Sequence, residues 1–413
     1  MSLFDIIATV VTLTALFSYI NFRFIRLPTT IGVMFISLVG SLLLLCLAKL
    51  GVGLQLEIQT EAWLKRIDFG DTLMHGMLSF LLFAGALFVN LDELARQKWV
   101  IASLATVGVL LSVFMVGGAT FLVFGWLGLE VPFIYCLLFG ALISPTDPVA
   151  VLGLLRRAGV PKTLESKITG ESLFNDGVGV VVFVVLLDVA RSGMVPDAFE
   201  IALLFAEEAV GGILFGVAVG YVGYRLLKDV DNYQVEVLIT LALVTGGYAG
   251  ADALHLSGPI AIVVAGLLIG NHGRMFAMSE STRQHLDTFW ELVDEVLNAV
   301  LFVLIGLEVL LVTFNGAYLL AGGIVVPIVL TARLVSVGLP VGLFRLGREV
   351  SPNAVWIMTW GGLRGGISVA LALSLPVGVE RDLLLTVTYA VVAFSILVQG
   401  LTVERLFVRR AAA

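Results

Sequence analysis

The sequence predicts an all-α polytopic membrane protein with about 13 transmembrane helices. Its composition, its separate apolar stretches and the distribution of its basic residues support this fold class. Of the 413 residues, 59% are hydrophobic and 13% are charged, and the mean hydropathy is +1.05. A soluble domain is about 45–50% apolar and about 25% charged, so this excess of apolar residues cannot be buried in one water-soluble core.

A sliding hydropathy window of about 19 residues identifies thirteen apolar stretches, and each is a candidate span. The ninth stretch is short and the eleventh is long, so we expect tilt and breaks in the spans. The stretches are 4–20, 29–49, 72–90, 99–126, 131–155, 163–190, 198–224, 234–254, 257–271, 289–312, 316–344, 352–375 and 383–404.

The basic residues support this number of spans. With the N-terminus outside, 16 of the 24 Lys and Arg fall in inside loops and the C-terminus, and only 5 fall outside. If one span were missing from this assignment, the excess of Lys and Arg in the inside loops would be lost. We therefore expect a multi-pass protein of the cell (inner) membrane with a cytoplasmic C-terminus. The net charge of −7 and the lack of a basic or aromatic binding face exclude nucleic acid as a partner.

Ionisable residues inside the spans are the candidates for function. A charged side chain at the bilayer centre costs at least about 2.5–3.5 kcal/mol, so such residues are rare without a role. Glu308 and Lys167 are less central, and we expect Glu308 to approach the outer interface. The central residues are Asp147, Glu171, Asp176, Arg333 and Arg364.

The sixth span carries the stretch GESLFNDG, residues 170–177. Ser172 and Asp176 are four residues apart and Asn175 is three from Ser172, so all three share one helical face. Glu171 lies on the adjoining edge. The resulting stripe of hydroxyl, amide and carboxylate groups is the oxygen-rich environment that a hard cation such as Na+ prefers, and a carboxylate in it can also bind a proton.

Two other spans contain helix-breaking sequences. In the fifth, Pro145 and Pro148 flank Thr146 and Asp147 and remove backbone donors in mid-membrane. In the twelfth, WGGLRGGISV places four glycines around Arg364, where a guanidinium would offset free carbonyl ends. The two spans run in opposite directions, so six spans, one linker span and six further spans predict inverted repeats with a transport site between two broken helices.

Arg333 in the eleventh span needs an anionic partner. Glu171 is our preferred partner, and a Glu171–Arg364 pair is the competing possibility. Glu171, Arg333 and Arg364 are also compatible with a purely structural role, as an ion pair and as charges that offset helix dipoles. Asn175 also suits a helix-packing hydrogen bond, and the Thr146 and Ser172 hydroxyls suit bonds to the preceding turn.

Five motifs resemble those of one transporter family. In order, SPTDPVAV, GESLFNDGVGVVVF, FVLIGLE, TARLVSV and GGLRGGISVALAL are similar to the monovalent cation/proton antiporters of the NhaP and Na+/H+ exchanger branch, over about residues 4–405. The resemblance implies broken helices that cross at mid-membrane and an elevator-type mechanism. It implies a core transport bundle (96–192 and 314–413) and an interface bundle (1–95 and 193–313) that forms a homodimer.

The resemblance also assigns roles to residues. Asp176 matches the carboxylate that takes either cation or proton, and Thr146, Ser172 and Asp147 match positions that coordinate Na+ with it. Asn175 matches the amide that organises the crossing of the broken helices. The supporting charges are Glu171, which matches the acidic half of an ion bridge to the Arg333 position, and Arg364.

The expected function is Na+ (or Li+)/H+ antiport for intracellular pH and sodium homeostasis. The Asn-Asp pair, in place of two adjacent aspartates, implies electroneutral 1:1 exchange. We expect no cofactor beyond the transported Na+ or Li+ and H+, no enzymatic activity, and membrane lipid and a second copy of the chain as partners. A potassium/proton antiporter of the same fold is the main alternative. A cation channel and an intramembrane aspartyl protease are remote ones.

Overall fold

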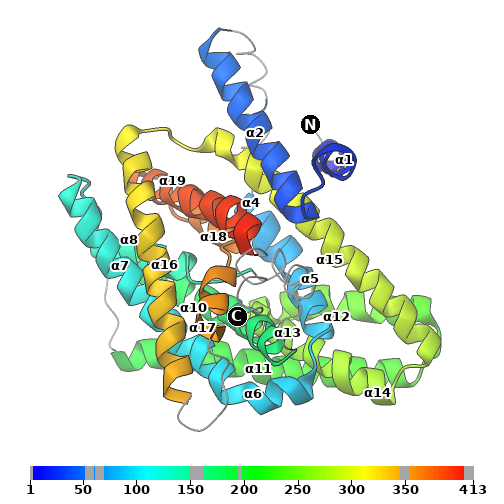
Figure 1. Ribbon diagram of the computed structural model, residues 1–413. Helices are drawn as coiled ribbons and strands as arrows, with labels where there is room; N and C mark the ends of the chain where they lie inside the picture. The colour runs from blue at the N-terminus through cyan, green and yellow to red at the C-terminus, as the bar shows by residue number, and fades with distance from the viewer. Residues whose placement is uncertain are drawn as a thin grey trace.

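The computed structural model describes residues 3–51, 60, 69–147, 162–193, 198–344 and 353–403, and the regular structure in them is helical. Figure 1 shows how the helices are arranged. They are α1 Leu3–Ile20, α2 Thr29–Lys49, α4 Phe69–Asp71, α5 Leu78–Leu87, α6 Leu91–Ser103, α7 Val109–Trp126, α8 Phe133–Leu142, α10 Lys162–Ser192, α11 Ala198–Lys228, α12 Tyr233–Ala253, α13 Gly258–Leu268, α14 Arg274–Phe276, α15 Glu280–Glu308, α16 Gly316–Phe344, α17 Ala354–Gly361, α18 Gly366–Leu373 and α19 Val379–Phe394.

The helices agree with the membrane prediction. Each of the thirteen predicted spans has a helical counterpart in the described residues, and nine of those described helices are long and apolar enough to cross a membrane. Helices α6 and α7 are joined through a π-helical segment, Leu104–Gly108, into one continuous rod. Large apolar side chains remain exposed on the outer helices, as expected for surfaces that contact lipid. Among them are Phe4, Phe114, Phe199 and Leu214.

The two predicted breaks are present, and they meet. Helix α8 ends at Leu142, and the chain is non-helical up to Asp147. Helix α17 ends at Gly361 and α18 begins at Gly366. The Asp147 N–H donates to the Leu363 carbonyl at 2.8 Å, in an isolated antiparallel bridge. The structure therefore confirms the break in the twelfth predicted span, and it shows that the non-helical segment after α8 meets it. Pro148 and the rest of the fifth predicted span, 149–155, lie outside the described residues.

Helix α16 differs from the expectation of a break in the long eleventh span. It is continuous from Gly316 to Phe344 although it contains Pro327 and Pro340. A proline frees one carbonyl of the preceding turn. The carbonyls concerned are those of Gly323 and Ser336, four residues before each proline, and the helix continues through both positions. A span can therefore contain proline and remain unbroken.

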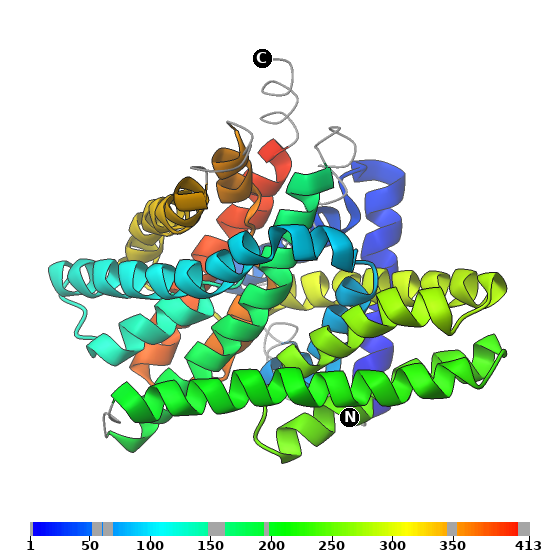
Figure 2. The same ribbon diagram turned by 90° about the horizontal axis from the view of Figure 1, so that it is seen from below.

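The helices pack in two sets around the crossing. Helix α10 packs on α6 and α8, and α16 packs on α7, α17 and α19. In the other set, α13 packs on α5, α11 and α12, and α15 packs on α2, α5 and α12. Figure 2 shows the long green helix α11 along one side of the molecule. These contacts describe a static arrangement, so the division into core and interface bundles stays a prediction.

Candidate functional site

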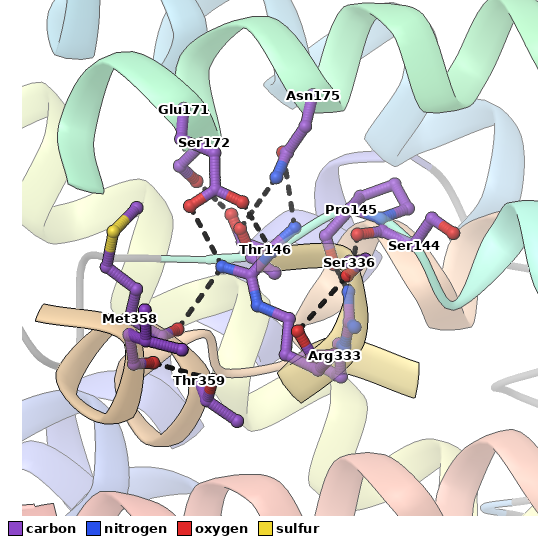
Figure 3. Close-up of polar contacts among 12 residues, drawn as sticks. Ser144, Pro145, Thr146, Glu171, Ser172, Asn175, Arg333, Ser336, Met358 and Thr359 are labelled. Atoms are coloured by element: carbon purple, nitrogen blue, oxygen red, sulfur yellow. Dashed lines mark hydrogen bonds and ion pairs between the residues drawn. The ribbon is translucent and has the colours of Figure 1, made fainter. Parts of the chain in front are cut away.

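The polar stripe of α10 is buried against the helix crossing. Glu171, Ser172, Asn175 and Asp176 are all at most 8% exposed. Figure 3 shows Glu171, Ser172 and Asn175 extending from this one helix toward Thr146 and Arg333. A continuous α-helix brings side chains one turn apart onto the same side, so the spacing read in the sequence is sufficient to assemble this half of the site.

Asn175 and Ser172 hold the non-helical residue Thr146. The Asn175 amide donates to the Thr146 hydroxyl at 2.8 Å and accepts from the Thr146 N–H at 3.4 Å. The Ser172 hydroxyl donates to the Thr146 carbonyl rather than to the preceding turn of its own helix. These contacts satisfy backbone groups that the break in the helix leaves free. Asn175 therefore has the position that was expected of an amide organising the crossing.

Arg364 caps the carbonyl end of α8. Its guanidinium donates to the Ser144 carbonyl and, at 3.0 Å, to the Pro145 carbonyl. Its own backbone N–H donates to the Ser395 hydroxyl at 2.9 Å. Free carbonyls at a helix C-terminus carry partial negative charge, which a cation stabilises. The structure confirms the interpretation that Arg364 offsets carbonyl ends. Ser395, its partner on the last predicted span, had not been expected.

The anionic partner of Arg333 is Glu171. The two side chains pair through two contacts, and the second joins Nη2 to Oε2 at 2.9 Å. Nη2 of Arg333 also donates to the Met358 carbonyl at 3.3 Å. Of the two pairings that the sequence left open, the structure contains the preferred one. The pair neutralises two buried charges and links α10, α16 and α17 beside the crossing.

Asp176 differs from its neighbours in α10. Its Oδ1 atom is buried and has no hydrogen-bond partner among the described residues. The side chain lines a cavity of about 760 Å³, together with Thr146, Asp147 and Ser172. None of the described residues that line this cavity is Lys, Arg or His. Its acidic lining residues are Glu93, Asp147, Glu165, Asp176, Glu291, Asp294 and Glu295.

These carboxylates make the cavity a region of negative potential inside a low-dielectric body, which concentrates cations. In the described part of the chain no three His, Cys, Asp or Glu side chains are grouped as a metal centre. The two aspartates and two hydroxyls that line the cavity, Asp147, Asp176, Thr146 and Ser172, instead supply oxygen atoms of the kind that suits a hard monovalent ion.

Sequence reasoning missed most of the polar residues that line this cavity. Asp294 and Asn298 of α15 are two of them. Asn298 interrupts the apolar run VLNAV, and that is the signal by which it could have been found. Glu308 was placed wrongly. It is 1% exposed instead of reaching the outer interface, because the end of α15 packs on α2, where the Ser41 hydroxyl donates to the Gly306 carbonyl at 2.9 Å.

Gly365 allows the two breaks to touch, and we expect its replacement by alanine to destabilise the protein. A Cβ atom there would lie 2.7 Å from Asp147 Oδ2 and 2.8 Å from Asp147 Cβ, so the backbone would have to move. Such overpacking costs about 1–3 kcal/mol, which thermal melting in detergent would detect. The matched control is Gly118→Ala in α7, where nothing lies within 4 Å. Equal melting temperatures for both variants would contradict the proposed close approach.

The chain matches a family model described as "Sodium/hydrogen exchanger, transmembrane" over residues 11–409. It is 53% identical to the Na(+)/H(+) antiporter NhaP of Pseudomonas aeruginosa, covering 98% of this chain and 96% of the relative. It is 36% identical to the Na(+)/H(+) antiporter NhaH of Halobacillus dabanensis, covering 82% and 83% of the two chains.

The fold has a counterpart among solved structures. The sodium proton antiporter MjNhaP1 of Methanocaldococcus jannaschii superposes with a TM-score of 0.75 and covers 98% of this chain and 99% of its own. The sequence identity to it is 19%, so this likeness concerns the fold. The family model, by contrast, spans nearly the whole membrane chain and includes both broken helices and the polar stripe of α10. The chain is therefore a member of the sodium/hydrogen exchanger family of membrane transporters.

Proposed function

We propose that the chain is a secondary active antiporter that exchanges Na+ (or Li+) for H+ across the cell membrane. The observation that carries the proposal is the buried Oδ1 of Asp176, which has no hydrogen-bond partner among the described residues and lies at a cavity whose described lining includes no Lys, Arg or His. A carboxylate in that position is stable only with a proton or a cation bound, because burial disfavours an uncompensated charge. The names of the NhaP and NhaH relatives support Na+ as the cation.

Asp176 is the shared site for the two ions in this mechanism. Asp147, Thr146 and Ser172 complete the cation site, since each lines the cavity beside it. A proton bound to Asp176 removes the negative charge that attracts the cation, and a bound cation displaces the proton. Competition for one carboxylate couples the two ions, so the mechanism needs no separate proton-binding site. Glu171, Arg333, Arg364 and Asn175 fix the geometry of the crossing.

The charges of the site support electroneutral 1:1 exchange. Asp147, Glu171 and Asp176 contribute three negative charges, and Arg333 and Arg364 contribute two positive charges, so the set carries a net charge of −1. One proton or one monovalent cation brings it to zero. A net charge is costly to move through the membrane interior, so the loaded forms cross and the empty form does not. A cation channel, one of the alternatives, would conduct without this requirement that a proton or cation be bound before the site moves.

The proposed movement is an elevator-type displacement of residues 96–192 and 314–413 against residues 1–95 and 193–313. The latter bundle forms the homodimer interface and is surrounded by lipid. Asn90, Glu93, Glu165 and Glu291 line the cavity near helix ends that the distribution of Lys and Arg assigns to the cytoplasm. We therefore infer an inward-open state. In the cell such exchange serves intracellular pH and sodium homeostasis.

Proteoliposomes that carry a pH gradient test this function directly. Na+, Li+ and K+ are added in turn, and a fluorescent pH indicator follows proton movement. Dissipation of the gradient by Na+ or Li+ is the expected result. Dissipation of the gradient by K+ alone would indicate potassium/proton exchange instead. No response to any of the three cations would contradict antiport. Transport currents that scale with membrane potential would contradict the 1:1 stoichiometry.

A further inference from the structure

Asp294 is a carboxylate of α15 that is held in place by a neighbouring amide. The Asn298 amide, one helical turn further on, donates to Asp294 Oδ1 at 3.0 Å and to the Asp294 carbonyl at 2.9 Å. Asn298 is 3% exposed, and both side chains line the large cavity. The amide thus fixes the direction of the carboxylate. The second carboxylate oxygen of Asp294 and the amide oxygen of Asn298 are acceptors that this contact does not use.

Asp294 shares its cavity with the two carboxylates of the inner site, Asp147 and Asp176. The cavity therefore places three carboxylates, from α15, the crossing and α10, along one continuous space. Asp176 is the buried member of the three: its side chain is 8% exposed, and its Oδ1 has no hydrogen-bond partner among the described residues.

Glu291 and Glu295 lie near Asp294 on the same helix but differ from it in setting. Both are exposed, whereas Asp294 is half-buried and oriented by Asn298. An exposed carboxylate acts on a cation mainly through its long-range field, which salt screens over about 8–10 Å. A fixed, partly desolvated carboxylate with an adjacent amide oxygen can replace water ligands of the ion directly, as hard cations require.

We propose that Asp294 and Asn298 form a transit site for the transported monovalent cation, which gives up part of its water shell to them before it passes to Asp147 and Asp176. This inference rests on the proposed antiport. Helix α15 falls in the expected interface bundle, and Asp147 and Asp176 fall in the expected core. The transit site thus presents the ion from one bundle to the other and lowers the cation concentration needed to load the transporter.

The test is the dependence of exchange on Na+ concentration in proteoliposomes containing Asp294→Asn. We expect the apparent KM for Na+ to rise about fivefold or more, because an ion pair at contact distance is worth about 1 kcal/mol even in water. The maximal rate should stay near the wild-type value, since loading is weakened while the inner site is intact. Asn298→Ala should raise KM less, and Asp294→Glu should restore part of the loss.

Glu291→Gln and Glu295→Gln are matched controls, because each removes one carboxylate of the same helix. Their effects should be small and should vanish in concentrated choline chloride, whereas the effect of Asp294→Asn should persist. An unchanged KM for Asp294→Asn would overturn the transit site. Equal, salt-screened shifts for all three variants would also overturn it, because they indicate a general field.

A binding readout separates this inference from the proposed function. Na+ that binds the folded protein raises its melting temperature, and Asp294→Asn should shift the half-saturating Na+ concentration upward. Wild-type protein that moves no protons with any cation would contradict antiport, and the melting series would still decide on Asp294. A melting curve with the wild-type Na+ dependence would exclude Asp294 as a cation ligand.

Discussion

Replacement of Asp176 by asparagine is expected to abolish cation/proton exchange while the protein remains folded. The amide has nearly the size of the carboxylate, but it carries no charge and binds no exchangeable proton at neutral pH. An ion pair at about 4 Å is worth about 4 kcal/mol at an effective dielectric constant of 20. Its loss corresponds to a roughly thousandfold weaker cation affinity. Dissipation of a pH gradient by Na+ in proteoliposomes measures the effect.

Asp188→Asn is the matched control for this experiment. Asp188 lies three turns further along α10, is exposed and does not line the cavity. The Asp188→Asn variant should exchange at the wild-type rate, which would show that loss of one carboxylate from this helix does not by itself abolish exchange. If Asp176→Asn exchanged as fast as the control, the shared site would have to lie elsewhere and the mechanism proposed above would be wrong.

The second large effect is expected on stability, from the buried pair of Glu171 and Arg333. Both residues are nearly inaccessible, at 1% and 7% exposure. Removal of one partner from such a pair costs about 3–5 kcal/mol, because the other charge is left buried without compensation. Glu171→Gln should therefore lower the melting temperature in detergent strongly. The double variant Glu171→Gln with Arg333→Gln should recover much of the loss, since neither charge then remains.

An exposed pair supplies the control. Arg283 and Glu280 of α15 are 3.5 Å apart at the surface, and exposed pairs contribute only about 0–1 kcal/mol. Glu280→Gln should melt close to wild type. A Glu171→Gln variant that melts like Glu280→Gln, or a double variant that is less stable than either single one, would show that the charge of the pair does not determine stability.

The sequence was sufficient for features that depend on local chemistry. The period of a helix alone places Glu171, Ser172, Asn175 and Asp176 side by side, and the Gly-rich segment around Arg364 indicates a break because glycine and proline act on the local backbone. The choice between Arg333 and Arg364 as partner of Glu171 was not accessible in this way. It depends on the distance between helices that are more than 100 residues apart.

Asp294 was missed for a related reason. It lies close to the start of the tenth predicted span, where a carboxylate is expected to reach water. Its membership in the cavity follows from the packing of α15 against α5 and α18, and no one-dimensional pattern records this packing. Glu308 illustrates the reverse error, since its place at the other end of the same span gave no sign that α2 covers it.

The pairing of Glu171 with Arg333 also has a consequence for biogenesis. The two residues are separated by 162 positions. At about 5–20 residues per second, a ribosome needs roughly 8–30 s to synthesise the intervening chain. During this interval Glu171 has no Arg333 to pair with, so its carboxylate must be solvated by water or by the insertion machinery. The first half of the protein therefore enters the bilayer before Glu171 has its partner, and the insertion of α16 supplies the positive charge of Arg333.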